Sequence, residues 1–388
     1  MSDRLDIVEA TGRRSRRRFA RLPFALHRDD PNWVPLLRKA QAKVFACKTA
    51  FFEHAEMALF LAERAGVSVG RVAAIHNVAH NAHYGDTVGF FGFFECRPDD
   101  TEAAVALMAR AEAWLAGRGL TAIRGPVNPS MNAECGMLIE GFEHPPMALM
   151  PYNPREYAGL MAAAGMAKCK DLYAYVVYPQ ELESGSPEYD RMIRLERVLN
   201  RRYPGLTLRS MDMRNYEEEI SRFMGVFEQA RKNNWGYVPV TEAESLELAR
   251  DMKRVIDPRI IVLAEVDGKP VGAALGIPNI NRGLAACRGR LFPFGFLKFL
   301  RAMKHVDEAR YFGLAALEEY RHKGITALML LENVQRSSRI GYRVCEASWV
   351  LEDNEISKRT IQHAARATLY KTYRIYEKAI ACDVINDR

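Results

Sequence analysis

Residues Tyr320–Ala327 carry the clearest chemical signal in the sequence. The apolar run Arg310–Leu317 before them predicts a strand, and the spacing of apolar residues over Leu328–Val334 predicts a helix. Gly324 marks the turn between the two. A strand that turns directly into a helix points unpaired backbone N–H groups and the positive end of the helix dipole at one place. We expect an anion there, best a pyrophosphate, although an ordinary strand–turn–helix corner shares this pattern.

The composition limits what kind of protein this can be. Its 388 residues are long for one domain, and 48% hydrophobic residues suffice for two cores. No apolar run approaches the ~20 residues that cross a bilayer, and the N-terminus lacks the apolar region of a signal peptide. The seven cysteines are scattered without a C-x-x-C spacing, which predicts reduced thiols in a cytoplasmic protein and no metal site. The net charge of +7 is compatible with CoA, anionic lipid or RNA.

The two halves of the chain repeat one pattern. Leu61–Glu63 recurs as Leu263–Glu265, 202 residues later. The same offset relates Gly66 to Gly268, Val69 and Gly70 to Val271 and Gly272, and Asn32 and Trp33 to Asn234 and Trp235. Agreement at one register over so many positions predicts a duplication. We expect a first domain over 1–180, a linker over 181–205 and a second domain over 206–388.

The second copy contains an insertion. Phe90 and Phe312 fall in matching predicted strands but lie 222 residues apart, so the second copy has about twenty extra residues. They lie near 281–304, where aromatic and aliphatic residues alternate with Arg and Lys. This composition suits a segment at a membrane interface or in a lipid-sized groove, with Phe294 and Phe296 in contact with substrate. A helix that packs the two copies together is the alternative.

The first copy has an acidic corner where the second has Gly324. Glu95, Asp99, Asp100 and Glu102 lie between a predicted strand and a predicted helix, without a glycine. A carboxylate at a helix N-terminus occupies the anion site with the protein's own charge. The first copy is therefore expected to lack the pyrophosphate loop and to keep only the scaffold.

Two other regions are candidates for contacts with partners. The polar loop after the predicted strand Thr121–Arg124 lies where α/β sheets often bind ligands, although its prolines also suit a structural turn. The basic run over 12–22 predicts the solvated face of a helix or peripheral contact with an anionic membrane, and nucleic acid is the least favoured partner. The candidate substrate contacts in the loop are Asn128, Ser130, Asn132 and Glu134.

The loop and the order of elements resemble a known superfamily. Arg321-x-x-Gly324-x-Thr326 resembles the acyl-CoA loop of Gcn5-related N-acetyltransferases, Arg/Gln-x-x-Gly-x-Gly/Ala, and departs from it at Thr326. Strand, two helices, hairpin, strand, turn, helix, strand, helix, strand is the order of that fold, here present twice. The resemblance implies an α/β fold with a mixed sheet in two tandem domains, and acyl-CoA as co-substrate.

The resemblance also implies roles for individual residues. The strand before the loop would splay from its neighbour and hold the pantetheine arm, and Asn354 matches an asparagine often found in the superfamily. The superfamily's tyrosine acid is replaced by Ile361, so Tyr370 and His363 are substitutes, and Glu318, Glu319 and Glu346 are candidate bases for the amine. The predicted cofactor-binding residues are Leu314, Ala316, Arg321, His322, Lys323, Gly324, Ile325, Thr326 and Asn354.

The reaction predicted from this resemblance is transfer of an acyl group from acyl-CoA to a primary amine. The aromatic insertion and the closing run Lys371–Lys378 look similar to the bacterial ceramide synthases, which implies a lipidic, sphingoid-type amine. The tandem arrangement with one silent copy also resembles the Fem-type aminoacyl transferases. A non-catalytic acyl-CoA-binding protein is the third possibility.

Overall fold

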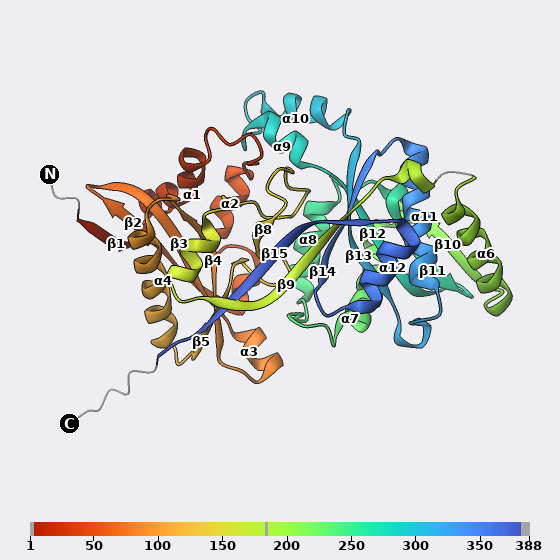
Figure 1. Cartoon of the computed structure of the whole chain (residues 1–388), viewed down its shortest axis with the longest axis horizontal. Helices are drawn as coiled ribbons and strands as arrows, with labels where there is room; N and C mark the ends of the chain where they lie inside the picture. Colours follow the sequence, from red (N-terminus) through yellow and green to blue (C-terminus); the bar gives the residue numbers. More distant parts are fainter. Residues whose placement is uncertain (1–3, 183–184, 382–388) are drawn as a thin grey trace. The chain divides into compact units, whose positions relative to one another are not determined.

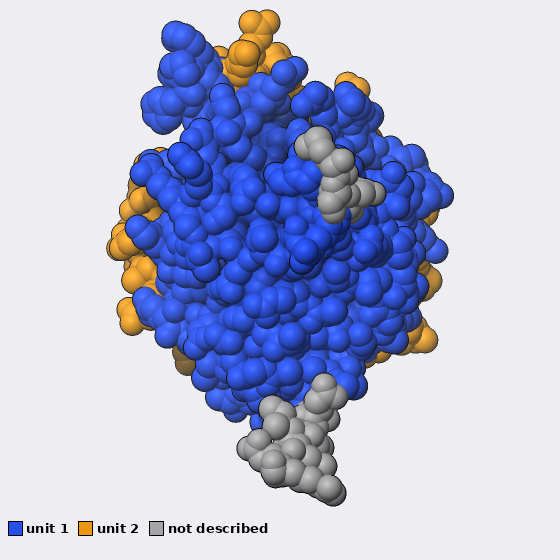
Figure 2. Space-filling view, turned by 90° about the vertical axis from the view of Figure 1, so that its left-hand side faces the viewer, with its two compact units in different colours: residues 1–171, 284–297, 372–388 blue, residues 172–283, 298–371 orange. Residues whose placement is uncertain are grey.

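The computed structural model describes residues 4–182 and 185–381. Their Cα positions divide into two compact units, coloured blue and orange in Figure 2. Unit 1 comprises Met1–Asp171, Leu284–Leu297 and Thr372–Arg388, and unit 2 comprises Leu172–Gly283 and Lys298–Lys371. Each unit therefore includes residues from both halves of the sequence.

The first copy lies in unit 1 except for the second half of its last strand, and Figure 1 labels most of its elements. Strand Val88–Cys96 contains Phe90, as the sequence predicted. The elements are β1 (Leu5–Glu9), α1 (Arg13–Leu26), α2 (Arg38–Val44), η1 (Ala50–Glu53), β2 (Ala55–Arg64), β3 (Val67–Asn77), α3 (Val78–Tyr84), β4 (Val88–Cys96), α4 (Thr101–Ala116), β5 (Ala122–Gly125), β6 (Val127–Asn128), β7 (Glu134–Cys135), β8 (Met137–Glu140), α5 (Tyr157–Ala163) and β9 (Ala167–Val177).

The second half of the sequence repeats this order. The elements are η2 (Pro179–Leu182), α6 (Pro187–Arg202), β10 (Leu206–Ser210), η3 (Met213–Asn215), α7 (Tyr216–Arg231), α8 (Glu242–Met252), η4 (Pro258–Ile260), β11 (Ile261–Val266), β12 (Lys269–Pro278), α9 (Asn281–Cys287), α10 (Gly295–Met303), β13 (Glu308–Ala316), η5 (Glu318–Tyr320), α11 (Ile325–Ile340), β14 (Val344–Leu351), α12 (Glu355–Ala365) and β15 (Thr368–Ala379).

The two units have the same strand order. In unit 1, β1, β2, β3 and β4 are antiparallel, β4 and β5 are parallel, and β5 pairs with the second half of β15. In unit 2, β10 to β13 are antiparallel, β13 and β14 are parallel, and β14 pairs with the second half of β9. The last strand of each copy thus completes the sheet of the other. This exchange adds the end of β15 to unit 1, whereas the break in unit 2 is at residues 284–297, which also belong to unit 1.

Glycines at matched positions show how closely the copies agree. A Cβ atom on Gly70 would lie 2.8 Å from Leu107 of α4, and one on Gly272 would lie 2.8 Å from Met329 of α11. Both helices contribute fully buried apolar side chains to the core of their unit. The second strand of each hairpin therefore needs a residue without a side chain where this helix crosses it. The predicted duplication is confirmed.

One part of the predicted organisation contains an element that the sequence did not predict. The stretch 181–205, predicted as a linker, contains the four-turn helix α6, which Ser186 caps by accepting a hydrogen bond from the Tyr189 N–H at 3.1 Å. Met192 and Leu199 bury one face of this helix, so a charged surface concealed an amphipathic element. The predicted domain boundaries stay a prediction. Among the described helices, none has the length and apolarity to cross a membrane.

Candidate active site

The corner between β13 and α11 in unit 2 presents a row of backbone donors. Within the described part of the chain, no group accepts a hydrogen bond from the backbone N–H of any residue in 322–327. The first intrahelical bond runs from the Leu328 N–H to the Gly324 carbonyl at 3.0 Å. These N–H groups and the helix dipole together form a site for an anion such as a pyrophosphate.

Gly324 is required by the backbone of this corner. Its φ angle is 92°, in the left-handed region that other residues seldom adopt. A Cβ atom there would also lie 2.9 Å from Leu195 Cδ1 of α6. His322, two residues earlier, also has a positive φ of 58°. Two positive φ values separated by one residue turn the chain sharply, so that neighbouring N–H groups can face the same side.

The strand that leads to this corner separates from its parallel neighbour. The register of β13 with β14 runs from Glu308 opposite Val344 to Tyr311 opposite Ala347, and then ends. β13 continues to Ala316 and stays paired with β12. Its edge toward β14 is therefore open over the predicted pantetheine-binding residues Leu314 and Ala316.

A buried carboxylate lies beside the point where the strands separate. Glu346 of β14 is opposite Arg310 of β13 and has no solvent exposure. Its Oε1 accepts a hydrogen bond from the Ser348 hydroxyl, and its Oε2 accepts one from the Tyr370 hydroxyl. The cationic atoms Arg310 Nε and Lys371 Nζ lie 3.7 and 3.8 Å from the two oxygens. Two cations and two hydroxyl donors offset the desolvation of this carboxylate.

These groups position one another. Arg310 Nε donates to Ser348 Oγ at 2.7 Å, and the ammonium group of Lys371 lies 4.7 Å from the centre of the Tyr370 ring. Arg310, Ser348 and Lys371 are buried, whereas Tyr370 is half-buried. Tyr370 is therefore the least enclosed residue of the network.

Cys345 does not provide a nucleophile next to Glu346. Complete burial raises the pKa of its thiol to about 12. Since the thiolate is the reactive form, this cysteine is inert near neutral pH. The groups around Glu346 suit proton transfer rather than a covalent acyl-enzyme at Cys345.

The structure separates the predicted catalytic residues into two groups. Glu346 and Tyr370 are in direct contact. The other three are exposed: Glu318 and Glu319 lie on η5, and His363 lies in the last turn of α12. Their catalytic roles stay a prediction, and burial and contacts favour the first pair.

Two predicted cofactor residues have structural contacts. Asn354 caps α12, with its side-chain oxygen accepting the Ser357 N–H at 3.0 Å. The Arg321 guanidinium donates to the Ala230 carbonyl at the end of α7 and faces the Ala316 carbonyl, 3.5 Å from Nε. Arg321 thus compensates the negative end of α7. The donors that remain for an anion are the backbone N–H groups of the loop, not this guanidinium.

Unit 1 has the acidic corner that its sequence predicted. Asp100 caps α4 by accepting the Ala103 N–H at 3.1 Å. Arg64 pairs with Asp100 at 2.9 Å and with Glu102 at 2.6 Å. The Arg64 hydrogen bond is the main reason why the pKa of Asp100 lies below its ordinary value. The helix N-terminus is filled by an ion pair, and a phosphate there would meet two carboxylates.

The fork between β4 and β5 in unit 1 is also filled. Pairing ends after Phe90 opposite Arg124, as in unit 2, but the loop then folds back onto β4. The Phe93 N–H donates to Asn128 Oδ1 at 2.6 Å, and a Cβ atom on Gly92 would lie 1.7 Å from the Val127 carbonyl oxygen. Asn128 therefore has a structural role in unit 1. The predicted substrate contacts of Asn128, Ser130, Asn132 and Glu134 stay a prediction.

Sequence reasoning missed Arg310, Ser348 and Lys371. Ser348 follows Glu346 by two residues in a strand, which places both on one face, and this signal was present. The pairing of Arg310 with Glu346 depends on the register of two parallel strands, which sequence does not show. Phe294 and Phe296, predicted to contact substrate, are exposed.

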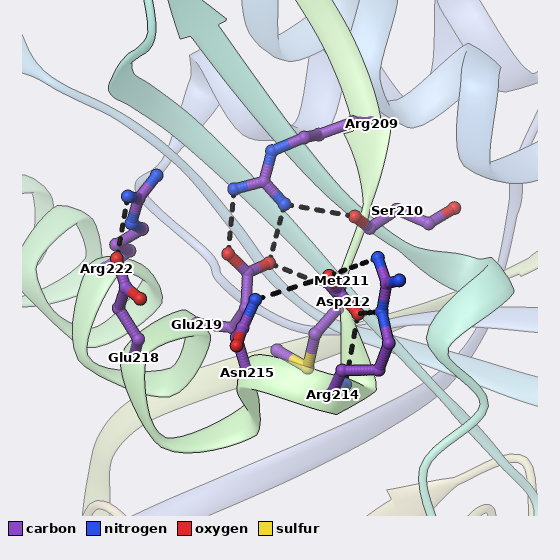
Figure 3. Close-up of a pocket in the computed structure, with 9 residues that line it drawn as sticks. All are labelled: Arg209, Ser210, Met211, Asp212, Arg214, Asn215, Glu218, Glu219 and Arg222. Carbon is purple, nitrogen blue, oxygen red and sulfur yellow. Dashed lines mark hydrogen bonds and ion pairs between the residues drawn. The ribbon is translucent and has the colours of Figure 1, made fainter.

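A pocket of about 440 Å³ lies elsewhere in unit 2, between β10 and the start of α7 (Figure 3). Its central contact is a bidentate ion pair, in which Arg209 donates to the two carboxylate oxygens of Glu219 at 2.6 and 2.8 Å. Arg222 pairs with Glu218 at 2.8 Å. The charges on its walls pair with one another, so this pocket offers a ligand no uncompensated group. The full lining is Arg209, Ser210, Met211, Asp212, Arg214, Asn215, Glu218, Glu219 and Arg222.

Comparisons with known proteins fit this geometry. The chain is 37% identical over 375 residues to the bacterial ceramide synthase of Caulobacter vibrioides (strain NA1000 / CB15N), covering 94% of each protein. The chain belongs to this family. Protein YghO of Escherichia coli (strain K12) is 33% identical over 368 residues, covering 93% of this chain and 92% of YghO. No family model matches the sequence.

Solved structures show the fold. A tandem GNAT protein from the clavulanic acid biosynthesis pathway aligns with a TM-score of 0.56 at 12% identity, covering 97% of this chain and 99% of that one. A GCN5-related N-acetyltransferase from Sphaerobacter thermophilus aligns with a TM-score of 0.54 at 15% identity, covering 98% and 97%. The predicted fold of two tandem Gcn5-related domains is confirmed. Together with the family, it makes the chain an N-acyltransferase of the Gcn5-related type.

Proposed function

We propose that this enzyme transfers an acyl group from acyl-CoA to a lipidic primary amine, with all of the chemistry in unit 2. The observation that carries the proposal is the combination of open backbone donors over 322–327 with the buried Glu346 network beside the open edge of β13. Unit 1 has the same strand order, but both corresponding places are filled by its own chain.

The corner at Gly324 would hold the CoA pyrophosphate. The unpaired N–H groups supply donors without the cost of breaking existing hydrogen bonds, and the helix dipole favours the negative charge. The open edge of β13, including Leu314 and Ala316, would hold the pantetheine arm by strand-like hydrogen bonds. A backbone N–H at this edge would polarise the thioester carbonyl.

Tyr370 and Glu346 would remove the proton of the attacking amine. An amine attacks a carbonyl only through a free electron pair, so its proton must leave. Tyr370 is half-buried and hydrogen-bonded to the enclosed Glu346, so its hydroxyl oxygen would accept the proton as its own proton moves to the carboxylate. The amine nitrogen then forms the amide bond, and the thiolate of CoA leaves. Arg310 and Ser348 hold Glu346 in place.

The nature of the amine rests on the relative's name and on the insertion. The relative named bacterial ceramide synthase covers nearly the whole chain at 37% identity. A ceramide is the amide of a fatty acid and a long-chain base, so the corresponding acceptor would be a sphingoid-type amine. The exposed aromatic residues of the insertion are consistent with a lipid in the vicinity.

The test is a thiol-release assay with palmitoyl-CoA and a panel of acceptors. We expect release of free CoA with a sphingoid-type long-chain base, and much slower release with spermidine, lysine or a peptide N-terminus. Equal or faster turnover of the small polar amines would contradict the lipid assignment and leave the fold intact. Binding of CoA without turnover of any amine would contradict catalysis. Transfer of an aminoacyl group from aminoacyl-tRNA would show that the donor is not acyl-CoA.

A further inference from the structure

The insertion between β12 and β13 exposes large apolar side chains. Phe292 is 82% exposed and Phe294 69% exposed, and Leu297 and Leu300 of α10 are each 54% exposed. A group of exposed apolar residues of this size is more typical of an interaction surface than of ordinary protein surface.

α10 has a packed side as well as an exposed one. A Cβ atom on Gly283 would lie 2.5 Å from Phe299 Cδ2 and 3.1 Å from Met303 Sδ, so these two side chains pack against the start of α9. Leu297 and Leu300 turn away from this contact and stay exposed. The helix is therefore held to the protein by one apolar side and presents the other to the surroundings.

The sequence around this helix carries only positive charge. Between Asp267 and Asp307 there is no Asp or Glu, whereas Arg290, Lys298 and Arg301 accompany the exposed apolar residues. A mixture of aromatic, aliphatic and basic residues without acids is typical of a helix that lies at a membrane surface. Aliphatic side chains such as Leu297 cannot stack on nucleic-acid bases, which disfavours RNA as the partner.

Further basic groups gather around Arg38, which contacts the insertion at Gly289, within unit 1. The Arg38 N–H donates to the Gly289 carbonyl at 3.0 Å, which joins the insertion to the start of α2. Burial and then the charges of Arg290, Arg21 and Arg17 lower the pKa of Arg38. The guanidinium groups of Arg290, Arg21 and Arg17 thus each repel that of Arg38. A surface that gathers like charges in this way has a strong field for an anionic partner.

We propose that a basic-aromatic patch, defined as Arg17, Arg21, Arg38, Arg290, Phe292 and Phe294, binds the surface of an anionic phospholipid bilayer. Phe292 and Phe294 insert among the lipid headgroups and upper acyl chains, and the four arginines face the phosphates. The exposed Leu297, which also belongs to unit 1, lies in the same interface. This inference concerns location and does not depend on the proposed reaction.

The test is co-sedimentation of the purified protein with vesicles, without acyl-CoA or amine. One set is phosphatidylcholine alone, and the other contains about a quarter phosphatidylglycerol, enough for a strongly negative surface. We expect binding to the second set only, with a fall as salt is raised. Equal binding to both sets, or to neither, would overturn the proposal.

Two double variants separate the apolar and electrostatic parts. Phe292→Ser with Phe294→Ser should reduce partitioning by about tenfold or more, since each buried aromatic ring contributes a large apolar surface. Arg17→Glu with Arg21→Glu should reduce it by at least about fivefold for each reversed charge.

Matched controls carry the same changes on other exposed surfaces. Leu246→Ser with Leu248→Ser on α8, and Arg194→Glu with Arg197→Glu on α6, should leave vesicle binding unchanged. Light scattering without lipid measures whether the exposed apolar residues instead hold two copies of the chain together. A dimer that dissociates in the phenylalanine variant would assign the apolar residues to a second copy of the chain and overturn membrane docking.

Discussion

The corners that open α4 and α11 are the same structural position in two copies of one fold, and they have opposite chemistry. α4 begins at Asp100, whose carboxylate accepts the helix N–H group and pairs with Arg64. α11 begins at Gly324, with no side chain to cap it. The unpaired N–H groups at a helix N-terminus can bind a side chain of the protein or a ligand. The copy in unit 1 uses its own side chain, and the copy in unit 2 leaves these groups for a ligand.

Buried carboxylates show a second contrast between the units. Glu95 in unit 1 is bonded to His27 at 2.6 Å and to the Tyr157 hydroxyl at 2.9 Å, with Arg71 at 3.6 Å. Both Tyr157 and Glu95 are buried. In unit 2 the tyrosine that contacts Glu346 is half-buried. We interpret the first cluster as a structural network and the second as a catalytic one, because only the second includes a tyrosine that is partly exposed.

Glu346→Gln should have the largest effect on turnover. Removing the proton acceptor is expected to slow amide formation by about 10²–10⁴-fold, the usual range for a general base. Glu318→Gln, an exposed carboxylate near the loop, is the matched control and should retain activity. The measurement is thiol release under saturating acyl-CoA, below the melting temperature of each variant. Full activity of Glu346→Gln would contradict its role as base.

Glu95→Gln should affect stability instead of chemistry. The substitution leaves the buried Arg71 without its carboxylate partner, which should lower the free energy of unfolding by on the order of 3 kcal/mol. Burial alone would raise the pKa of Glu95, but His27, Arg71 and Tyr157 outweigh it and lower the pKa below 4.5. This contribution to stability is therefore complete above pH 4.5 and lost as the pH falls through the lowered pKa.

Denaturant unfolding as a function of pH checks the prediction for Glu95. Wild type should lose stability below pH 4.5 more steeply than Glu95→Gln, while the variant keeps its thiol-release rate near neutral pH. The same pH slope in both proteins would mean that the network around Glu95 does not contribute to folding.

Gly324→Ala should weaken CoA binding. The added methyl group forces a positive φ on a non-glycine residue and contacts Leu195, so the N–H groups of the corner shift. Gly341→Ala at the other end of α11 is the control, because it has a φ of 99° and no atom within 4 Å of its Cβ position. Both variants should lose stability of about 1 kcal/mol from the strained φ. Calorimetric titration should show reduced CoA affinity in Gly324→Ala alone.

Asp100→Ala should have the smallest effect. Loss of an N-cap side chain destabilises by about 0.5–2 kcal/mol, and Arg64 keeps its pair with Glu102. We expect a slightly lower melting temperature and unchanged CoA affinity. A changed affinity would show that the acidic corner in unit 1 takes part in binding.

Much of the fold could be predicted from sequence because its signals are local. The offset between Leu61 and Leu263 identified the duplication, and the carboxylates over 95–102 identified the filled corner. The exchange of β9 and β15 could not be predicted, because both strands have the same alternating pattern whichever sheet they join. α6 was missed because its exposed face is densely charged.

The candidate active site was predictable only in part, for a related reason. Gly324 belongs to a contiguous motif, so its neighbours followed directly. The network around Glu346 joins β13, β14 and β15, and the register that brings Arg310 and Lys371 to one carboxylate is set by long-range pairing. Glu346 and Tyr370 were candidates among several, and only burial distinguished them from Glu318, Glu319 and His363.

Titration calorimetry with CoA tests the central claim, that only the corner in unit 2 binds the nucleotide. The wild-type chain should bind one CoA, Asp100→Ala should also bind one, and Gly324→Glu should bind none, since a carboxylate would then lie where the pyrophosphate belongs. Circular dichroism would confirm that the variant remains folded. Two bound CoA molecules in the wild type, or one in folded Gly324→Glu, would contradict the account.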